Sequence, residues 1–275
     1  MSVVKDMKSS STRGILHAAA GKDKFTLSRF EPSSQLKAFV EHYWIIRYDL
    51  QDGLPYTQKV LSYPNVHLAF EQDDEGQRVL LYGIPMTPFV RRLQGAGKVL
   101  GVKFRVGGFY PFWRQDVSLL NGTTIPASKL FGHDVDAYVD KVLCAGENAS
   151  MAKQAESFLL ERLPEEDEQA EFAASIIEEI IGDRDIIKVE QISERVGLSI
   201  RQLQRLFRKY IGVSPKWAIK RFRLQEAAER LEKDETPQWA ELAVQLGYFD
   251  QAHFIKDFKA VIGQSPAVYK KQLDS

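Results

Sequence analysis

The spacing of hydrophobic residues changes about two-fifths of the way along the chain. Before residue 109, short apolar runs at 43–48, 67–70, 79–82 and 99–104 are separated by turn residues, which predicts β-strands. The segments 73–76 (DDEG) and 95–98 (GAGK) predict two hairpin turns. From about Phe109 onward, apolar residues recur at intervals of three and four, which predicts helices.

Polar stretches divide this pattern into three regions. Residues 1–24 begin with a polar, Ser-rich segment and predict a flexible lead-in. The charged segment 164–168 (PEEDE) predicts a linker between a β-rich domain with a helical connector, residues 25–165, and a helical domain, residues 169–275. The predicted fold class is therefore α+β, with an all-α C-terminal domain.

The helical region contains two copies of one pattern. Residues 189–197 (VEQISERVG) match residues 239–247 (WAELAVQLG), with apolar residues at the first, fourth and eighth places and Gly at the last. The second copy then has one extra residue. After it, Phe207, Gly212, Ser214 and Pro215 correspond to Phe258, Gly263, Ser265 and Pro266.

The first copy has the features of a helix-turn-helix. Its short helix ends at Gly197, and Ser199 with Gln202 predicts a capping box at the start of the second helix. That second helix has one apolar face and one polar face. The apolar face holds Leu203, Leu206, Phe207 and Tyr210, and the polar face holds Arg201, Gln204, Arg205 and Arg208.

The second copy follows the same plan. Asp250 is the predicted cap, Phe254 and Phe258 are predicted core residues, and the exposed face holds Gln251, Ala252, His253 and Lys256. A long helix is predicted to join the two copies, with Ser214 as its cap and Pro215 at its first position.

Basic residues cluster within this region, although the chain as a whole has no net charge, with 37 Lys and Arg against 37 Asp and Glu. From Arg201 to Arg223 there are eight Lys or Arg and no acidic residue, which suits a polyanionic partner. An amphipathic basic helix is by itself more often a solvated surface. Two such helices, each after a Gly turn and each followed by Gly-x-Ser-Pro, favour the major groove of double-stranded DNA.

These motifs resemble the DNA-binding domain of AraC/XylS-type transcription regulators over residues 169–271. The resemblance is carried by residues 192–199, 203–208, 212–215, 223–227, 242–243, 246–254, 258–259 and 263–266, with Tyr269. It implies two helix-turn-helix units joined by one long helix. Their recognition helices, at about 200–210 and 250–261, would enter adjacent segments of the major groove.

The resemblance also assigns roles to individual residues. Those expected to read bases are Arg201, Gln204 and Arg205 in the first unit and Gln251, Ala252, His253 and Lys256 in the second. Those expected to contact phosphate are Ser199, Arg208 and Lys209, with the amides that begin each recognition helix. The second unit has Ala252 and Ile255 where the first has Arg201 and Gln204, so we expect the first unit to supply more of the base specificity.

The region 13–108 resembles a poorly characterised sensor-like domain that precedes such DNA-binding units. The resemblance implies a small-molecule effector or a homodimer, and RNA polymerase as a partner if the regulator is an activator. A candidate effector pocket consists of Tyr43, Trp44, Phe70, Arg105 and Trp113, although a β-domain core also needs aromatic residues. The apolar stripe of 151–163 fits either a dimer helix, which we favour slightly, or packing within its own domain.

The sequence gives little support to other classes of protein. The single cysteine, Cys144, excludes a four-cysteine zinc site and with it the DNA-repair alkyltransferases fused to related DNA-binding domains. His42 and His67 lack the paired spacing of metal ligands, and no catalytic motif is present, so we expect neither metal, cofactor nor enzyme activity. Without a signal peptide or an 18-residue apolar run, we expect a cytoplasmic bacterial protein that does not bind membranes. A structural DNA-bending protein without an effector remains an alternative.

Overall fold

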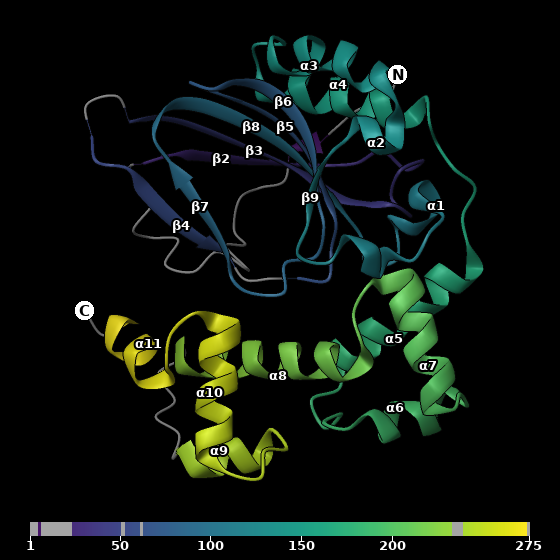
Figure 1. The fold of residues 1–275 in the computed structure, drawn as a ribbon, viewed down its shortest axis with the longest axis vertical. Helices are drawn as coiled ribbons and strands as arrows, with labels where there is room; N and C mark the ends of the chain where they lie inside the picture. The colour runs from purple at the N-terminus through teal and green to yellow at the C-terminus, as the bar shows by residue number, and fades with distance from the viewer. Residues whose placement is uncertain (1–4, 7–23, 51–52, 61–62, 233–238, 274–275) are drawn as a thin grey trace.

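The computed structural model describes residues 5–6, 24–50, 53–60, 63–232 and 239–273 (Figure 1). A β-rich N-terminal domain is followed by a helical C-terminal domain, which confirms the predicted α+β class. Most of the predicted lead-in, residues 1–24, lies outside the described residues.

A seven-stranded antiparallel sheet is the centre of the N-terminal domain. Its strands lie in the order β1 (Lys5–Asp6), β2 (Thr26–Glu31), β3 (Val40–Leu50), β8 (Gly95–Phe104), β5 (His67–Asp73), β6 (Gly76–Tyr82) and β9 (Thr124–Pro126). A second sheet consists of β4 (Tyr56–Val60) and β7 (Phe89–Leu93). It contacts the large sheet through the rings of Phe89 and Tyr82, whose centres are 5.7 Å apart.

The two predicted hairpins have different outcomes. The turn at 73–76 is confirmed, because β5 and β6 pair from Asp73 opposite Gly76 back to His67 opposite Tyr82. The hairpin at 95–98 is wrong, because these residues begin β8, which pairs with β3 and β5 rather than with β7.

The glycines of β8 explain this difference. Added Cβ atoms at Gly97 and Gly101 would lie 2.3 Å from Tyr48 Oη and 2.0 Å from Trp44 Cε2. The missing side chains therefore leave room for the large rings of β3. Glycine in a strand interior often marks such a close approach rather than a turn.

Short helices cover one face of the large sheet (Figure 1). They are α2 (Ser128–Phe131), η3 (His133–Val135), α3 (Asp136–Leu143) and α4 (Asn148–Leu160). In the stripe that we favoured as a dimer helix, Ala152, Ala155, Phe158 and Leu159 are fully buried within the N-terminal domain. That preference was wrong: the stripe packs on its own sheet, since Phe158 contacts Phe70 with ring centres 6.1 Å apart.

The C-terminal domain is helical throughout its described residues. It contains α5 (Glu168–Gly182), α6 (Val189–Val196), α7 (Ile200–Leu206), the π-helical turn η4 (Phe207–Ile211), α8 (Pro215–Glu232), α9 (Trp239–Gln245), α10 (Gln251–Ile262) and α11 (Pro266–Leu273). Between the sheet and these helices lie α1 (Tyr110–Trp113) and η2 (Val117–Leu120). Below, "first unit" means residues 189–211 and "second unit" means residues 239–262.

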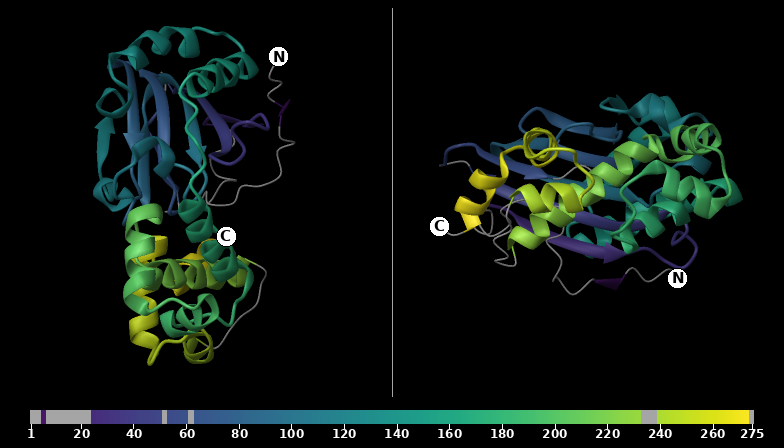
Figure 2. Two further views of the ribbon diagram at one scale, coloured as in Figure 1. Left: turned by 90° about the vertical axis from the view of Figure 1, so that its right-hand side faces the viewer. Right: turned by 90° about the horizontal axis from the view of Figure 1, so that it is seen from below.

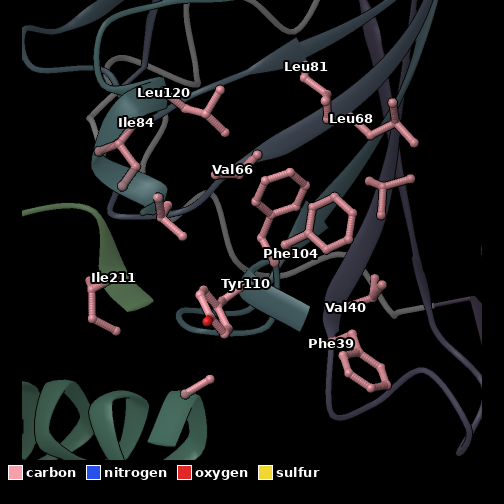
Figure 3. Close-up of a cluster of buried hydrophobic side chains, with 14 of the residues drawn as sticks. Phe39, Val40, Val66, Leu68, Leu81, Ile84, Phe104, Tyr110, Leu120 and Ile211 are labelled. Atoms are coloured by element: carbon pink, nitrogen blue, oxygen red, sulfur yellow. The ribbon is translucent and has the colours of Figure 1, made fainter. Parts of the chain in front are cut away.

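The buried apolar residues do not divide at the boundary between the two domains. One continuous cluster runs from the sheet, through Phe104 and Tyr110, to Ile211 of the first unit and Phe222 of α8 (Figure 3). A separate cluster between Leu224 and Tyr269 is the core of the second unit with the rest of α8 and α11. The two cores therefore meet in the middle of α8.

Candidate nucleic-acid interface

The first unit forms as predicted, because its turn and cap are determined locally. Helix α6 ends at Gly197, whose φ of 67° is a left-handed conformation that favours glycine. The Ser199 hydroxyl then accepts a hydrogen bond from the backbone N–H of Gln202 (3.3 Å), and the Gln202 side chain accepts one from the Ser199 N–H (2.9 Å). This capping box fixes the direction in which α7 leaves the turn.

Helix α7 presents the predicted polar face to solvent. Arg201, Gln204 and Arg205 are all exposed, and among the described residues no side-chain hydrogen bond or ion pair engages them. Leu203 is fully buried on the opposite face. Two guanidinium groups and one amide are thus available to an external partner along one side of the helix.

The second unit is capped in an equivalent way. The Asp250 carboxylate accepts a hydrogen bond from the backbone N–H of His253 (2.7 Å), and Gln251, Ala252, His253 and Lys256 are exposed. The imidazole Nε2 of His253 lies 3.6 Å from Asp257, whose carboxylate also pairs with Lys220 of α8 (3.0 Å). This arrangement holds the His253 ring against α10 while leaving part of it open to solvent.

Helix α8 places the two recognition helices on the same side of the domain. The Ser214 hydroxyl caps α8 by accepting a hydrogen bond from the Trp217 N–H (3.1 Å). Helices α7 and α10 both cross the line of α8 and run roughly parallel to each other, along one edge of the molecule (Figures 1 and 2). The end of α7 that continues into η4 faces the N-terminal domain, so its first turn points away from that domain.

The phosphate candidates lie at opposite ends of this helix. Ser199 is exposed at the free end of α7. Arg208 instead pairs with Asp116 of the N-terminal domain, with 3.2 Å between Nε and Oδ2. The ammonium group of Lys209 lies over the rings of Tyr110 and Tyr210, 5.2 and 4.9 Å from their centres.

The run of eight basic residues is not a single DNA-facing surface. Arg221 and Arg223 of α8 are buried, with 1% and 2% of their surfaces exposed. Burial lowers the pKa of Arg221 to about 10, and its guanidinium donates a hydrogen bond to Gln225 (2.9 Å). Arg223 pairs with Glu226 (2.8 Å) and also donates to the Ile180 carbonyl of α5. These two residues are therefore not open to DNA, and the basic surface is smaller than the sequence predicts.

The aromatic candidates for an effector pocket lie on two faces of the sheet. Tyr43 and Phe70 are fully buried on the face covered by α4. Trp44 lies on the opposite face and donates its indole N–H to Nδ1 of His67 (3.3 Å). Burial lowers the pKa of His67 to about 3, so this imidazole is neutral and available as an acceptor.

The other two effector candidates lie at the junction between the domains. Arg105 pairs with Glu178 of α5 (3.1 Å) and lines a cleft of about 260 Å³ between that helix and the N-terminal domain. Trp113 of α1 stacks on Phe109, with 6.3 Å between ring centres. The five candidates are thus spread over two faces of the sheet and the junction, and an effector site remains a proposal.

Two features of this region were missed from the sequence. The first is the contact of Asp116 and Tyr110 with Arg208 and Tyr210, which joins residues about 90 to 100 positions apart and leaves no local signal. The second is Phe249, whose side chain is 97% exposed directly before the cap of α10. Its signal was the extra residue in the second copy of the repeat.

Two family models match separate parts of the chain. Residues 28–126 match a domain of unknown function (DUF6597), and residues 192–272 match a helix-turn-helix domain. The HTH-type transcriptional activator AarP of Providencia stuartii is 33% identical over 105 residues, which cover 36% of this chain and 77% of AarP. The chain belongs to the AraC/XylS-type family of DNA-binding transcription regulators.

Other relatives match over shorter parts of their length. An uncharacterized HTH-type transcriptional regulator of Haemophilus influenzae is 35% identical over 85 residues, 31% of this chain and 28% of that protein. This chain therefore aligns with less than a third of that regulator. These relatives are transcription regulators rather than enzymes.

Solved structures align with part or most of the chain. The C-terminal domain of AraT, a response regulator from Geobacillus stearothermophilus, is 25% identical over 38% of this chain and 88% of that chain, with a TM-score of 0.34. ToxT from Vibrio cholerae is 12% identical over 92% of this chain and 100% of that chain, with a TM-score of 0.40. None of the helices among the described residues combines the length and apolar character needed to cross a membrane.

Proposed function

We propose that this family member binds specific DNA sequences, with α7 and α10 reading adjacent segments of one major groove face. The observation that carries this proposal is the position of the two capped recognition helices, which lie on one side of α8 with their polar faces open to solvent. In helix-turn-helix proteins the first residues of the recognition helix contact base edges. In both units these residues are exposed.

The exposed side chains suit particular bases. Arg201 and Arg205 can each donate two hydrogen bonds to O6 and N7 of guanine, and Gln204 and Gln251 can pair with N6 and N7 of adenine. Ser199 and the free amides at the start of α7 suit a phosphate group, because a helix N-terminus carries partial positive charge. The first unit offers more directional donors than the second.

Selection from random DNA with the full chain tests this proposal. We expect an enriched sequence that binds at least about a thousandfold more tightly than random DNA, with steep loss of affinity as salt increases. Random DNA competing nearly as well as the selected sequence would contradict the proposal. That result would instead support a structural DNA-bending protein.

Control by a small-molecule effector in the N-terminal domain is the second part of the proposal. Its support is the buried cluster that joins the sheet to the first unit, since a change of packing around the sheet would reach Tyr210 and Ile211 directly. Such a regulator acts in the bacterial cytoplasm, and a homodimer and, for an activator, RNA polymerase are its proposed partners. Thermal-shift screening of the full chain against metabolites should find a compound that also changes affinity for the selected DNA. Compounds that stabilise the chain without changing that affinity would contradict effector control.

A further inference from the structure

Phe249 stands in solvent directly in front of the second recognition helix. Its side chain is 97% exposed, more than any other large hydrophobic residue among those described. It immediately precedes Asp250, the cap of α10. A phenyl ring in this position loses contact with water only when another molecule covers it.

The first unit shows what this position does in an ordinary helix-turn-helix. There Leu198 is the single residue between Gly197 and the cap, and it is half-buried against the core. An apolar residue before the cap commonly packs in this way and fixes the entry of the chain into the helix.

The extra residue of the second unit transfers that packing role to Tyr248. Its ring lies 5.6 Å from the ring of Phe254 and 5.4 Å from that of His253, measured between centres. Burial and the negative charge of Asp257 raise the pKa of the Tyr248 phenol well above its usual value, as expected for a neutral phenol that packs against the core. Phe249 is consequently pushed outward, free of the core.

We infer that Phe249 reads the 5-methyl group of a thymine in the major-groove segment that α10 enters. The inference rests on the proposed function and adds a base and a contact to it. Phenylalanine and alanine side chains contact thymine methyl groups in major grooves. Ala252, exposed in the first turn of α10, adds a second apolar group beside the ring. The second unit would thus select a base through apolar contacts, whereas the first unit has Arg201 at the position of Ala252.

Replacing single thymines in the selected DNA by deoxyuridine tests the inference, because this change removes the methyl group and nothing else. We expect the full chain to lose about fourfold in affinity at one thymine of the α10 segment, the effect of one buried methyl group. Phe249→Ala should bind the thymine and deoxyuridine sites equally well, and Phe249→Leu should keep part of the difference.

Val244 provides the matched control. It is a large apolar residue of α9 in the same unit, 66% exposed, so Val244→Ala should keep the full thymine preference. Equal thymine preference in Phe249→Ala and the unaltered chain would overturn the inference. Insensitivity of the unaltered chain to every deoxyuridine would also overturn it. Failure of the proposed function is a different result, since selection would then yield no preferred sequence at all.

Discussion

The first unit is packed into the N-terminal domain, whereas the second unit has a core of its own. Tyr210 of the first unit contacts Tyr110 with 4.4 Å between ring centres, and Asn121 donates a hydrogen bond to the Gly212 carbonyl (2.6 Å). The buried residues of the second unit belong to a separate cluster, which starts at Leu224. Two copies of one motif thus stand in different structural contexts.

Because of this difference, the parts that should move or unfold independently are not the two domains seen in the sequence. The predicted linker at 164–168 lies between α4 and the first residue of α5, but the packing changes only within α8. The N-terminal sheet and the first unit should therefore respond as one body. The second unit should change its position or stability more independently, because its buried cluster adjoins the other cluster within α8.

The largest expected effect comes from removing one buried ring in each core. Phe207→Ala and Phe258→Ala each delete a fully buried phenyl group, which costs about 3–5 kcal/mol of stability. Native-state hydrogen exchange should show Phe207→Ala lowering the protection of β3 and β8, and Phe258→Ala lowering that of α9, α10, α11 and the end of α8 but not that of the sheet. Loss of protection in the sheet after Phe258→Ala would contradict two separate cores.

The next largest expected effect is the loss of stability when the glycine at the junction between the domains is replaced. Gly212 has a φ of 95°, and an added Cβ would lie 2.7 Å from Ile84 Cδ1 and 3.0 Å from Val117 Cγ1. Gly212→Ala should therefore lose more than the roughly 1–2 kcal/mol of backbone strain alone. Gly197→Ala is the control, since its φ is 67° and nothing lies within 4 Å of the added atom. Chemical denaturation measures the free energy of unfolding of both variants. Equal losses would mean that Ile84 and Val117 move aside at little cost.

Base reading should differ between the two units. Arg205→Ala should cost about 1–3 kcal/mol on the selected DNA and relax the preference at one base pair. Lys256→Ala should cost less, because the second unit offers fewer directional donors. Titration of selected and random DNA measures both values. A loss for Arg205→Ala that is the same on random DNA would place this residue at the phosphate backbone instead.

The smallest expected effect concerns the ion pair between Arg208 and the N-terminal domain. Asp116→Asn removes the partner of Arg208, whose side chain is 68% exposed. Arg208 then no longer has to break an ion pair to contact phosphate. The free energy of DNA binding should therefore improve on every sequence by the free energy of an exposed ion pair, about 0.2–1 kcal/mol. Asp134→Asn removes the same charge from η3, among the helices that cover the sheet, where Asp134 pairs with Arg162, and should leave DNA affinity unchanged. An unchanged affinity for Asp116→Asn would show that Arg208 does not reach phosphate.

Features set by neighbouring residues were predictable from the sequence, and features set by distant contacts were not. The Gly197 turn and the Ser199 and Asp250 caps follow from hydrogen bonds within four residues, so the recognition helices were identified with nearly correct ends. The glycines of β8 look like a turn until Trp44 and Tyr48, some 50 residues away, are known to pack on them.

The burial of two arginines of α8 also could not be predicted from the sequence. Arg221 and Arg223 lie on a helix that is covered from several sides, by Tyr63 of the N-terminal domain and by α5, and such covering depends on the whole fold. Phe249 is an intermediate case: the extra residue before α10 is visible in the repeat, but which of two aromatic residues turns inward is settled by packing on Phe254.

The most direct test of the account compares the sequences selected from random DNA by the full chain, by Arg205→Ala and by Gln251→Ala. Two recognition helices on one face predict two preferred blocks about one helical turn, ~10 base pairs, apart. Arg205→Ala should then relax the preference at a base pair of one block and Gln251→Ala at a base pair of the other. A single block, or equal weakening of both blocks by each variant, would contradict side-by-side reading by α7 and α10.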